Sequence, residues 1–146
     1  MTVARIPLPR KTKRTRRTNR LTTAAPDEGL TGFVHGLKAS KDEERTAISL
    51  RAIRLGFTFQ QDLKVRTQLE KKSIDFLVHT KPRPTPLEVQ GFIGHGTASQ
   101  KAADELRRTI IDNETRGTWE RVKFVTYEHT YDQERLNTEI RRLFRN

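Results

Sequence analysis

The order of helix and strand signals constrains the fold of this chain more than any other feature. Ser40 with Glu43 and Thr97 with Gln100 match the capping-box pattern that opens helices, and a third helical periodicity lies near the C-terminus. Between these signals lie short apolar runs of strand character, bounded by glycine, proline or polar residues. The expected helices cover about 41–55, 97–116 and 136–144, and the expected strands cover 57–65, 74–79, 86–91 and 119–127.

This order, α-β-β-β-α-β-α, predicts an α/β fold with a mixed four-stranded sheet. Three strands that follow one another through short connections are expected to pair antiparallel. The helix at about 97–116 then leads to the fourth strand through a right-handed crossover. We therefore expect helices on both faces of the sheet and a core built from Trp119, the phenylalanines and the aliphatic side chains.

The N-terminal segment has a composition that disfavours folding. Residues 1–20 hold eight lysines and arginines and no acidic residue, out of a net charge of +11 for the chain. Such a segment buries too little apolar surface to offset its ordering entropy. We expect residues 1–39 to be a disordered basic tail and linker, and residues 40–146 to be the domain. Arg14, Arg16 and Arg17 are candidate phosphate contacts in this tail, with a merely solubilising tail as the alternative.

Composition also narrows the functional classes. The chain has no cysteine, which excludes disulfides, zinc–thiolate sites and thiol nucleophiles and suits a reducing compartment. No apolar run approaches the roughly 20 residues of a membrane span, so a membrane partner is not expected. The basic balance favours nucleic acid as the partner. A cytoplasmic protein of prokaryotic or phage origin fits these features best, and mitochondrial import through the arginine-rich start is the weaker alternative.

Two acidic residues interrupt strands that should lie inside the sheet. Asp75 sits within Ile-Asp-Phe-Leu-Val, and Glu88 within Leu-Glu-Val-Gln, where Glu88 and Gln90 share a face. A buried carboxylate needs a cation or strong donors nearby. If the strands are neighbours, both acids can bind one Mg²⁺, a cation that prefers oxygen ligands. The alternative is that each acid pairs with an arginine. Glu44 lies on the inward stripe of the first helix, whereas Glu43 is expected to serve the capping box.

These elements together resemble the PD-(D/E)XK nuclease superfamily, most closely the very-short-patch-repair-like endonucleases. The resemblance rests on the helix with Glu44, then the strands G56-F57-T58-F59-Q60-Q61, I74-D75-F76-L77-V78 and P86-L87-E88-V89-Q90-G91, followed by F92-I93-G94-H95. It extends to D104-x-x-R107, the G117-T118-W119 turn and V122-K123-F124-V125. It covers residues 40–146 and implies a restriction-endonuclease-like fold.

The resemblance also implies roles for individual residues. Asp75 and Glu88 would be metal ligands, with Mg²⁺ as the expected ion and Mn²⁺ as its substitute, and Glu44 would orient a metal-bound water. The sequence departs from the family at Gln90, where the family usually has lysine, because glutamine only orients and donates hydrogen bonds. His95 would act as a general acid or base, with a plain loop histidine as the alternative.

The sequence therefore predicts a metal-dependent endonuclease that hydrolyses phosphodiester bonds in nucleic acid, with DNA ahead of RNA. A homodimer would suit cleavage of both strands. Two alternatives stay open: a catalytically inactive nucleic-acid-binding module of the same fold, and a structural ribonucleoprotein component. The phosphate contacts expected within the domain include Lys101, Arg107 and Arg108.

Overall fold

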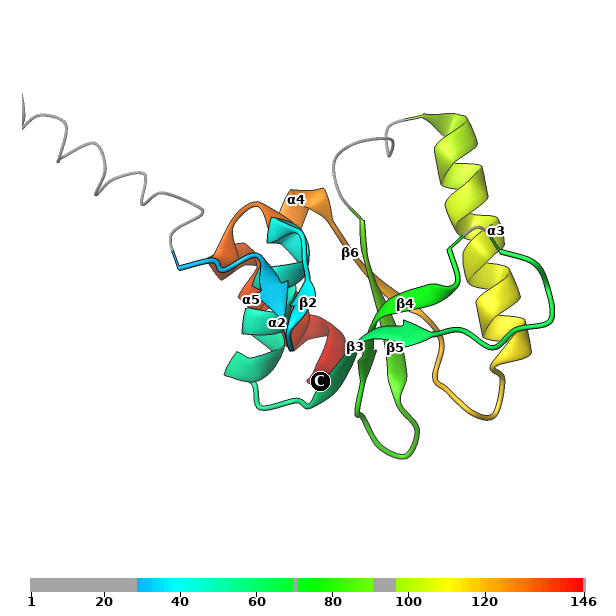
Figure 1. Ribbon diagram of the computed structural model, residues 1–146, viewed down its shortest axis with the longest axis horizontal. Helices are drawn as coiled ribbons and strands as arrows, with labels where there is room; N and C mark the ends of the chain where they lie inside the picture. The colour runs from blue at the N-terminus through cyan, green and yellow to red at the C-terminus, as the bar shows by residue number, and fades with distance from the viewer. Residues whose placement is uncertain (1–28, 70, 91–96, 146) are drawn as a thin grey trace, which may run out of the picture.

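A computed structural model describes residues 29–69, 71–90 and 97–145, and shows a four-stranded mixed sheet with helices on both faces (Figure 1). The helices α2 and α5 lie together on one side of the sheet, and α3 lies on the other. The elements, in chain order, are β1 (Phe33–Val34), β2 (Leu37–Lys38), α2 (Lys41–Ala52), β3 (Phe57–Asp62), β4 (Ser73–Val78), β5 (Thr85–Gln90), α3 (Ala98–Glu114), β6 (Lys123–Thr126), α4 (Tyr127–Thr130) and α5 (Gln133–Phe144).

The sheet topology confirms the expected order of strands. The strands lie in the order β3-β4-β5-β6; β3 pairs antiparallel with β4, and β4 with β5. The helix α3 then leads to β6, which pairs parallel with β5. A parallel neighbour requires a crossover connection, and here α3 provides it.

One face of the sheet carries the main core. Phe57 and Phe59 of β3, Phe76 of β4 and Leu87 of β5 pack with Leu50, Leu136 and the other inward side chains of α2 and α5. Phe76 contacts both aromatic neighbours, with ring centroids 5.2 Å from Phe57 and 5.1 Å from Phe59. Alternation along the strands places these residues on one face. Asp75 and Glu88 therefore lie on the other face, toward α3.

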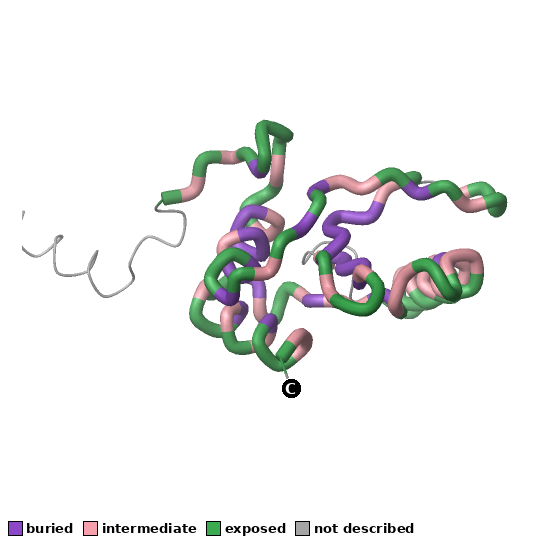
Figure 2. The backbone as a smooth tube through the Cα atoms, turned by 90° about the horizontal axis from the view of Figure 1, so that it is seen from below, coloured by how far each residue is buried: buried purple, intermediate pink, exposed green. Residues whose placement is uncertain are grey.

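The α3 face is covered much less completely. Of the residues of α3, only Ile111, near its C-terminal end, is buried, and it packs with Leu63, Ile74 and Val122. Figure 2 shows the contrast, because α3 is drawn mostly as exposed or half-exposed while α2 and the central strands carry the buried segments. The helix is thus anchored near one end. Its N-terminal half leaves room between itself and β5–β6.

The folded part begins earlier than the sequence predicts. The expected linker up to residue 39 includes the hairpin β1–β2, which is part of the domain. Its turn uses His35 and Gly36, both at positive φ (49° and 81°), as two-residue hairpin turns require. Val34 is fully buried in the main core, and the His35 ring stacks on Phe57. The linker prediction was wrong for 30–39, because the buried Val34 and the stacked His35 ring dock this segment on the domain.

Most other boundaries agree with the sequence to within three residues, and two differences are larger. The capping box of Ser40 and Glu43 is present at the start of α2, and Thr97 caps α3 by accepting from the Gln100 backbone N–H. The expected strand at 119–127 is shorter, because Thr118 and Trp119 donate to the Thr115 carbonyl in a turn. The helical turn α4 was not predicted. Among the described residues, no helix has the length and apolar character needed to cross a membrane.

The hairpin is held to α2 through Glu44. Its carboxylate accepts the Thr31 backbone N–H (2.9 Å), the Thr31 hydroxyl (2.8 Å) and the Gly32 backbone N–H (2.7 Å), and the residue is only 5% exposed. In Glu44→Gln, an acceptor oxygen is replaced by an amide NH2 group, which is itself a donor and cannot accept from Thr31 or Gly32. We expect a loss of about 1–3 kcal/mol in the free energy of unfolding, measured by urea denaturation. The matched change at the exposed Glu105 should cost less than about 0.5 kcal/mol, and equal stability of both variants would contradict this role.

The contribution of Glu44 should also depend on pH. Burial has the largest influence and raises the pKa of Glu44, but the hydrogen bonds from Thr31 and Gly32 outweigh it and hold the pKa below its usual value. A carboxyl whose pKa is lower in the folded state stabilises the protein above its unfolded pKa, about 4.3, and loses that effect as the pH falls through the folded value. The difference in unfolding free energy between wild type and Glu44→Gln should therefore be constant above about pH 5.5 and shrink below about pH 4. A pH-independent difference would argue against a charged anchor.

Candidate functional site

Asp75 and Glu88 lie side by side on neighbouring strands. The pairing of Phe76 with Leu87 places Asp75 and Glu88 one step further along the same antiparallel register, and alternation puts both on the α3 face. Asp75 is 2% exposed and Glu88 is 7% exposed. Asp75 Oδ2 accepts the backbone N–H of Val89 at 2.8 Å, which ties the two strands together at this point. Two buried carboxylates thus meet where β4 and β5 are joined.

One ammonium group contacts both carboxylates. Lys71 Nζ lies 2.5 Å from Asp75 Oδ1 and 3.9 Å from Glu88 Oε2. The side chain of Lys71 is 47% exposed, so it reaches the pair from the solvent side. Because two like charges this close repel one another, a cation beside them stabilises both ionised forms. The arrangement is therefore a site for positive charge, filled here by lysine.

Arg107 of α3 fixes the second carboxylate from the helix side. Its Nε donates to Glu88 Oε1 at 2.9 Å and its Nη2 lies 3.3 Å from Glu88 Oε2, which makes a two-point contact. The guanidinium also donates to the carbonyl oxygens of Lys71 (2.7 Å) and Ser73 (2.8 Å). Arg107 was expected to contact phosphate, but these partners make it the link between α3, the start of β4 and Glu88.

Of the two candidate carboxylates at the start of α2, Glu43 rather than Glu44 is influenced by the charge of Asp75. The carboxylate of Glu44 is bound by Thr31 and Gly32, so the prediction that it orients a water at the metal site is not met. Burial is the main cause that raises the pKa of Glu43, and the negative charge of Asp75 raises it further. The capping box explains the difference, because it turns the N3 side chain back over the helix end while Glu44 faces the hairpin.

The carboxylate pair opens into a cavity of about 420 Å³ between β5 and α3. Its wall includes Asp75, Glu88 and Lys71, together with Gln90 and Asp104. The Gln90 amide lies 3.5 Å from Asp104 Oδ2, and the Gln100 amide donates to Asp104 Oδ1 at 3.0 Å. Gln90 is therefore on the expected face, beside the pair, and it turns toward α3. The carboxylates are paired with cations and nearly buried, and the cavity that they line is open to solvent.

The other residues predicted to contact nucleic acid or to act in catalysis do not contact the carboxylate pair, or lie outside the described residues. Lys101 is exposed on α3, and the Arg108 guanidinium lies 5.3 Å from the centroid of the Phe124 ring. His95, Arg14, Arg16 and Arg17 lie outside the residues that the structure describes. Sequence reasoning missed Lys71, although two consecutive lysines, Lys71 and Lys72, directly precede the strand that carries Asp75 and were a usable signal.

Comparisons with family models, curated proteins and solved structures gave no significant match. Over residues 29–69, 71–90 and 97–145, no group of three or more His, Cys, Asp or Glu side chains lies in ligating proximity. A cation at this site would have two carboxylates, from Asp75 and Glu88, as its protein ligands.

Removing Arg107 tests how strongly the stability of the site depends on the contacts of Arg107 with Glu88 and with the backbone before β4, here called the Arg107 clamp. Arg107→Met leaves the buried Glu88 carboxylate without its two-point partner and breaks the link from α3 to the start of β4. We expect a loss of about 3–5 kcal/mol in the free energy of unfolding, because a buried charge is left uncompensated. Arg121→Met is the control, since that side chain is 83% exposed, and it should cost less than about 1 kcal/mol. Similar values for the two variants in urea denaturation would contradict the clamp.

Proposed function

We propose that this chain is a Mg²⁺-dependent nuclease that hydrolyses phosphodiester bonds, with DNA as its substrate. The observation that carries the proposal is the placement of Asp75 and Glu88 on one face of neighbouring strands, beside a cavity that opens to solvent. Two acids buried inside a sheet are costly for folding, and buried, charge-paired acids that line a cavity are candidates for a functional site. The order of elements and the position of these acids are those of the PD-(D/E)XK resemblance.

The chemistry of the donor set suits a divalent ion. Mg²⁺ is commonly bound through one or two carboxylates and keeps several waters, which matches the Asp75 and Glu88 oxygens next to an open cavity. When bound, such an ion supplies an activated water and stabilises charge on the phosphoryl oxygens. The contact of Lys71 with both carboxylates supports the assignment, because it indicates that the pair attracts a cation. Mn²⁺, which favours similar oxygen ligands, is the expected substitute.

Lys71 can supply the positive charge that is missing at Gln90, where the PD-(D/E)XK family usually has lysine. Glutamine cannot supply positive charge, and its amide lies near Asp104 rather than at the carboxylate pair. The ammonium of Lys71 reaches the pair from the solvent side with a half-exposed stem. If an ion were held by Asp75 and Glu88, the Lys71 ammonium would be released from these carboxylates and would supply positive charge beside a bound phosphate. We therefore assign Lys71 the charge-stabilising role.

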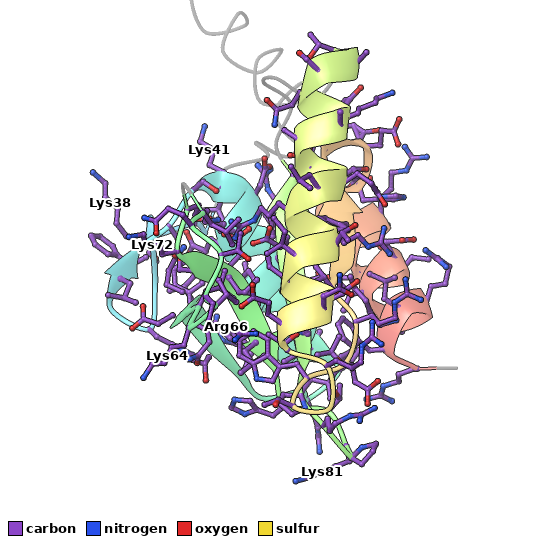
Figure 3. The ribbon with its side chains drawn as sticks, turned by 90° about the vertical axis from the view of Figure 1, so that its right-hand side faces the viewer. Lys38, Lys41, Lys64, Arg66, Lys72 and Lys81 are labelled. Carbon is purple, nitrogen blue, oxygen red and sulfur yellow. The ribbon has the colours of Figure 1, made fainter. Side chains whose placement is uncertain are left out.

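Charge on the surface fits a polyanionic substrate. Lys38, Lys41, Lys64, Arg66 and Lys72 form a basic edge, defined by these five exposed residues, along the side of the domain that holds β1–β2 and β3–β4 (Figure 3). Phosphates bound there would be held without reading the sequence. Lys72 of the basic edge directly follows Lys71, which contacts the carboxylate pair, so the basic edge begins next to this pair in the chain.

A second candidate is a nucleic-acid-binding module of the same fold without catalysis. The observation that favours it is the two-point contact of Arg107 with Glu88, which occupies one of the two metal-binding carboxylates. Under this alternative, Asp75 and Glu88 serve only to anchor Lys71 and α3. Binding would then be salt-dependent and insensitive to Asp75→Asn.

Plasmid cleavage separates the two candidates. Asp75→Asn removes one of the two anionic ligands while keeping the size of the side chain, so Mg²⁺-dependent nicking should fall by more than about a hundredfold. Asp62→Asn is the matched control on β3, where the aspartate is exposed, and it should nick as wild type does. EDTA should abolish nicking by wild type and by Asp62→Asn. Equal nicking by wild type and Asp75→Asn would overturn the proposed function.

Lys71→Met tests the assigned charge. The rate of cleavage at saturating Mg²⁺ should fall about a hundredfold, because the charge beside the phosphate is lost. The Mg²⁺ concentration for half-maximal rate should stay equal or decrease, since the ammonium no longer competes for the carboxylates. Lys72→Met, at an exposed neighbour, should mainly weaken DNA binding. A rate unchanged by Lys71→Met would remove Lys71 from the mechanism.

A further inference from the structure

A second cavity lies beside the carboxylate pair, between β5, β6, α3 and α4. It has a volume of about 500 Å³, which is within the usual range of small-ligand pockets. Gln90, Asp104 and Phe124 line both this cavity and the one that holds Asp75 and Glu88. The two spaces are therefore neighbours that share a wall. Resting on the proposed function, we propose that the second cavity binds one nucleobase of the substrate strand, with preference for a base that carries an exocyclic amino group.

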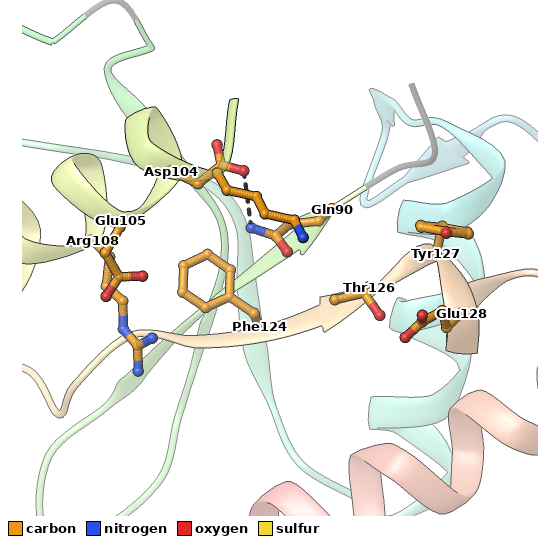
Figure 4. A pocket seen from close by; sticks show the side chains of 9 residues that line it. Gln90, Asp104, Glu105, Arg108, Phe124, Thr126, Tyr127 and Glu128 are labelled. Atoms are coloured by element: carbon orange, nitrogen blue, oxygen red, sulfur yellow. Dashed lines mark hydrogen bonds between the residues drawn. The ribbon is translucent and has the colours of Figure 1, made fainter. Parts of the chain in front are cut away.

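The first argument is the flat surface that the cavity offers. Phe124 pairs with Glu88 in the parallel register and so lies on the α3 face, where its ring borders the cavity (Figure 4). The Arg108 guanidinium lies 5.3 Å from the centroid of that ring. Aromatic rings and guanidinium planes are the surfaces on which unpaired bases stack, and every base has a face that suits them. A planar heterocycle is thus a natural ligand for this wall.

The second argument is the charge of the lining. Three carboxylates, those of Asp104, Glu105 and Glu128, border the cavity against two cationic side chains, Lys101 and Arg108. A phosphate group here would face a net excess of negative charge and would be repelled. A neutral ligand with hydrogen-bond donors meets no such penalty. The cavity therefore suits a base, while the phosphates stay with Lys71 and the basic edge.

The third argument is the pair of side chains that can read an edge of the base. Gln90 and Asp104 lie 3.5 Å apart at the wall between the cavities and present an amide beside a carboxylate (Figure 4). The carboxylate is oriented by the Gln100 amide at 3.0 Å. Carboxylates accept from the amino group of cytosine, and glutamine can both accept from and donate to adenine. Thymine offers no amino group to either residue. Gln90 and Asp104 are therefore proposed as the residues that determine specificity.

Binding to short single strands tests this proposal without requiring cleavage. Labelled strands of eleven nucleotides, all thymidine except for one central dA, dC or abasic nucleotide, are compared with the all-thymidine strand by fluorescence anisotropy in EDTA. Wild type should bind the dA or dC strand about tenfold more tightly than the all-thymidine strand. It should bind the abasic strand no more tightly than the all-thymidine strand. The double variant Gln90→Leu/Asp104→Leu, which leaves neither side chain able to hydrogen-bond the base, should remove this preference, and Asp62→Leu, at an exposed residue of β3, should keep it.

The outcomes separate this inference from the proposed nuclease activity. Binding of all strands with equal Kd, or a preference that survives the double variant Gln90→Leu/Asp104→Leu, would overturn the base pocket and leave the cleavage result untouched. A base preference in a protein whose plasmid nicking is unaffected by Asp75→Asn would support the pocket and overturn the nuclease. Failure to bind any of the strands would overturn the pocket and leave nicking to decide the activity.

Discussion

The meeting of two carboxylates across β4 and β5 is the constraint on which the rest of this structure depends. Asp75 and Glu88 are nearly inaccessible, and each would be costly to ionise alone. The fold meets that cost from two directions, with Lys71 from the solvent side and Arg107 from α3. Arg107 also binds the backbone before β4, so the position of α3 over the sheet follows from the need to neutralise Glu88.

The helix α3 covers its face of the sheet incompletely, and this leaves the cavities that lie beside Asp75 and Glu88. The opposite face is filled by α2, α5 and the aromatic cluster, while α3 contributes one buried side chain, Ile111. A helix held at Ile111 and by the Arg107 contact leaves its N-terminal half away from β5 and β6. Two cavities result, one at the carboxylate pair and one at the Phe124 ring. A sheet face that a better-packed helix would seal is thereby open to ligands.

Local patterns predicted most of the fold and only part of the site. The capping boxes, the glycine stops and the apolar strand runs set the element order, because these signals act over a few neighbouring residues. The pairing of Asp75 with Glu88 also followed from alternation and strand order. The sequence assigned Glu43 to the capping box and Glu44 to the inward stripe, but it could not show that Glu44 binds the backbone at Thr31 and Gly32, because this contact depends on the docked hairpin. Lys71 was missed because its closest partner, Asp75, lies four residues further along a non-helical segment, where that spacing does not by itself predict a contact.

The central claim, that Asp75 and Glu88 bind one divalent ion, is tested most directly by locating that ion. Crystals grown with Mn²⁺ and measured near the manganese absorption edge would show it as an anomalous peak. The account predicts one peak per chain within metal–oxygen distance, a little over 2 Å, of both carboxylates, with the Lys71 ammonium displaced from between them. A map without a peak at this position, in which Lys71 and Arg107 keep their contacts with the two carboxylates, would contradict it.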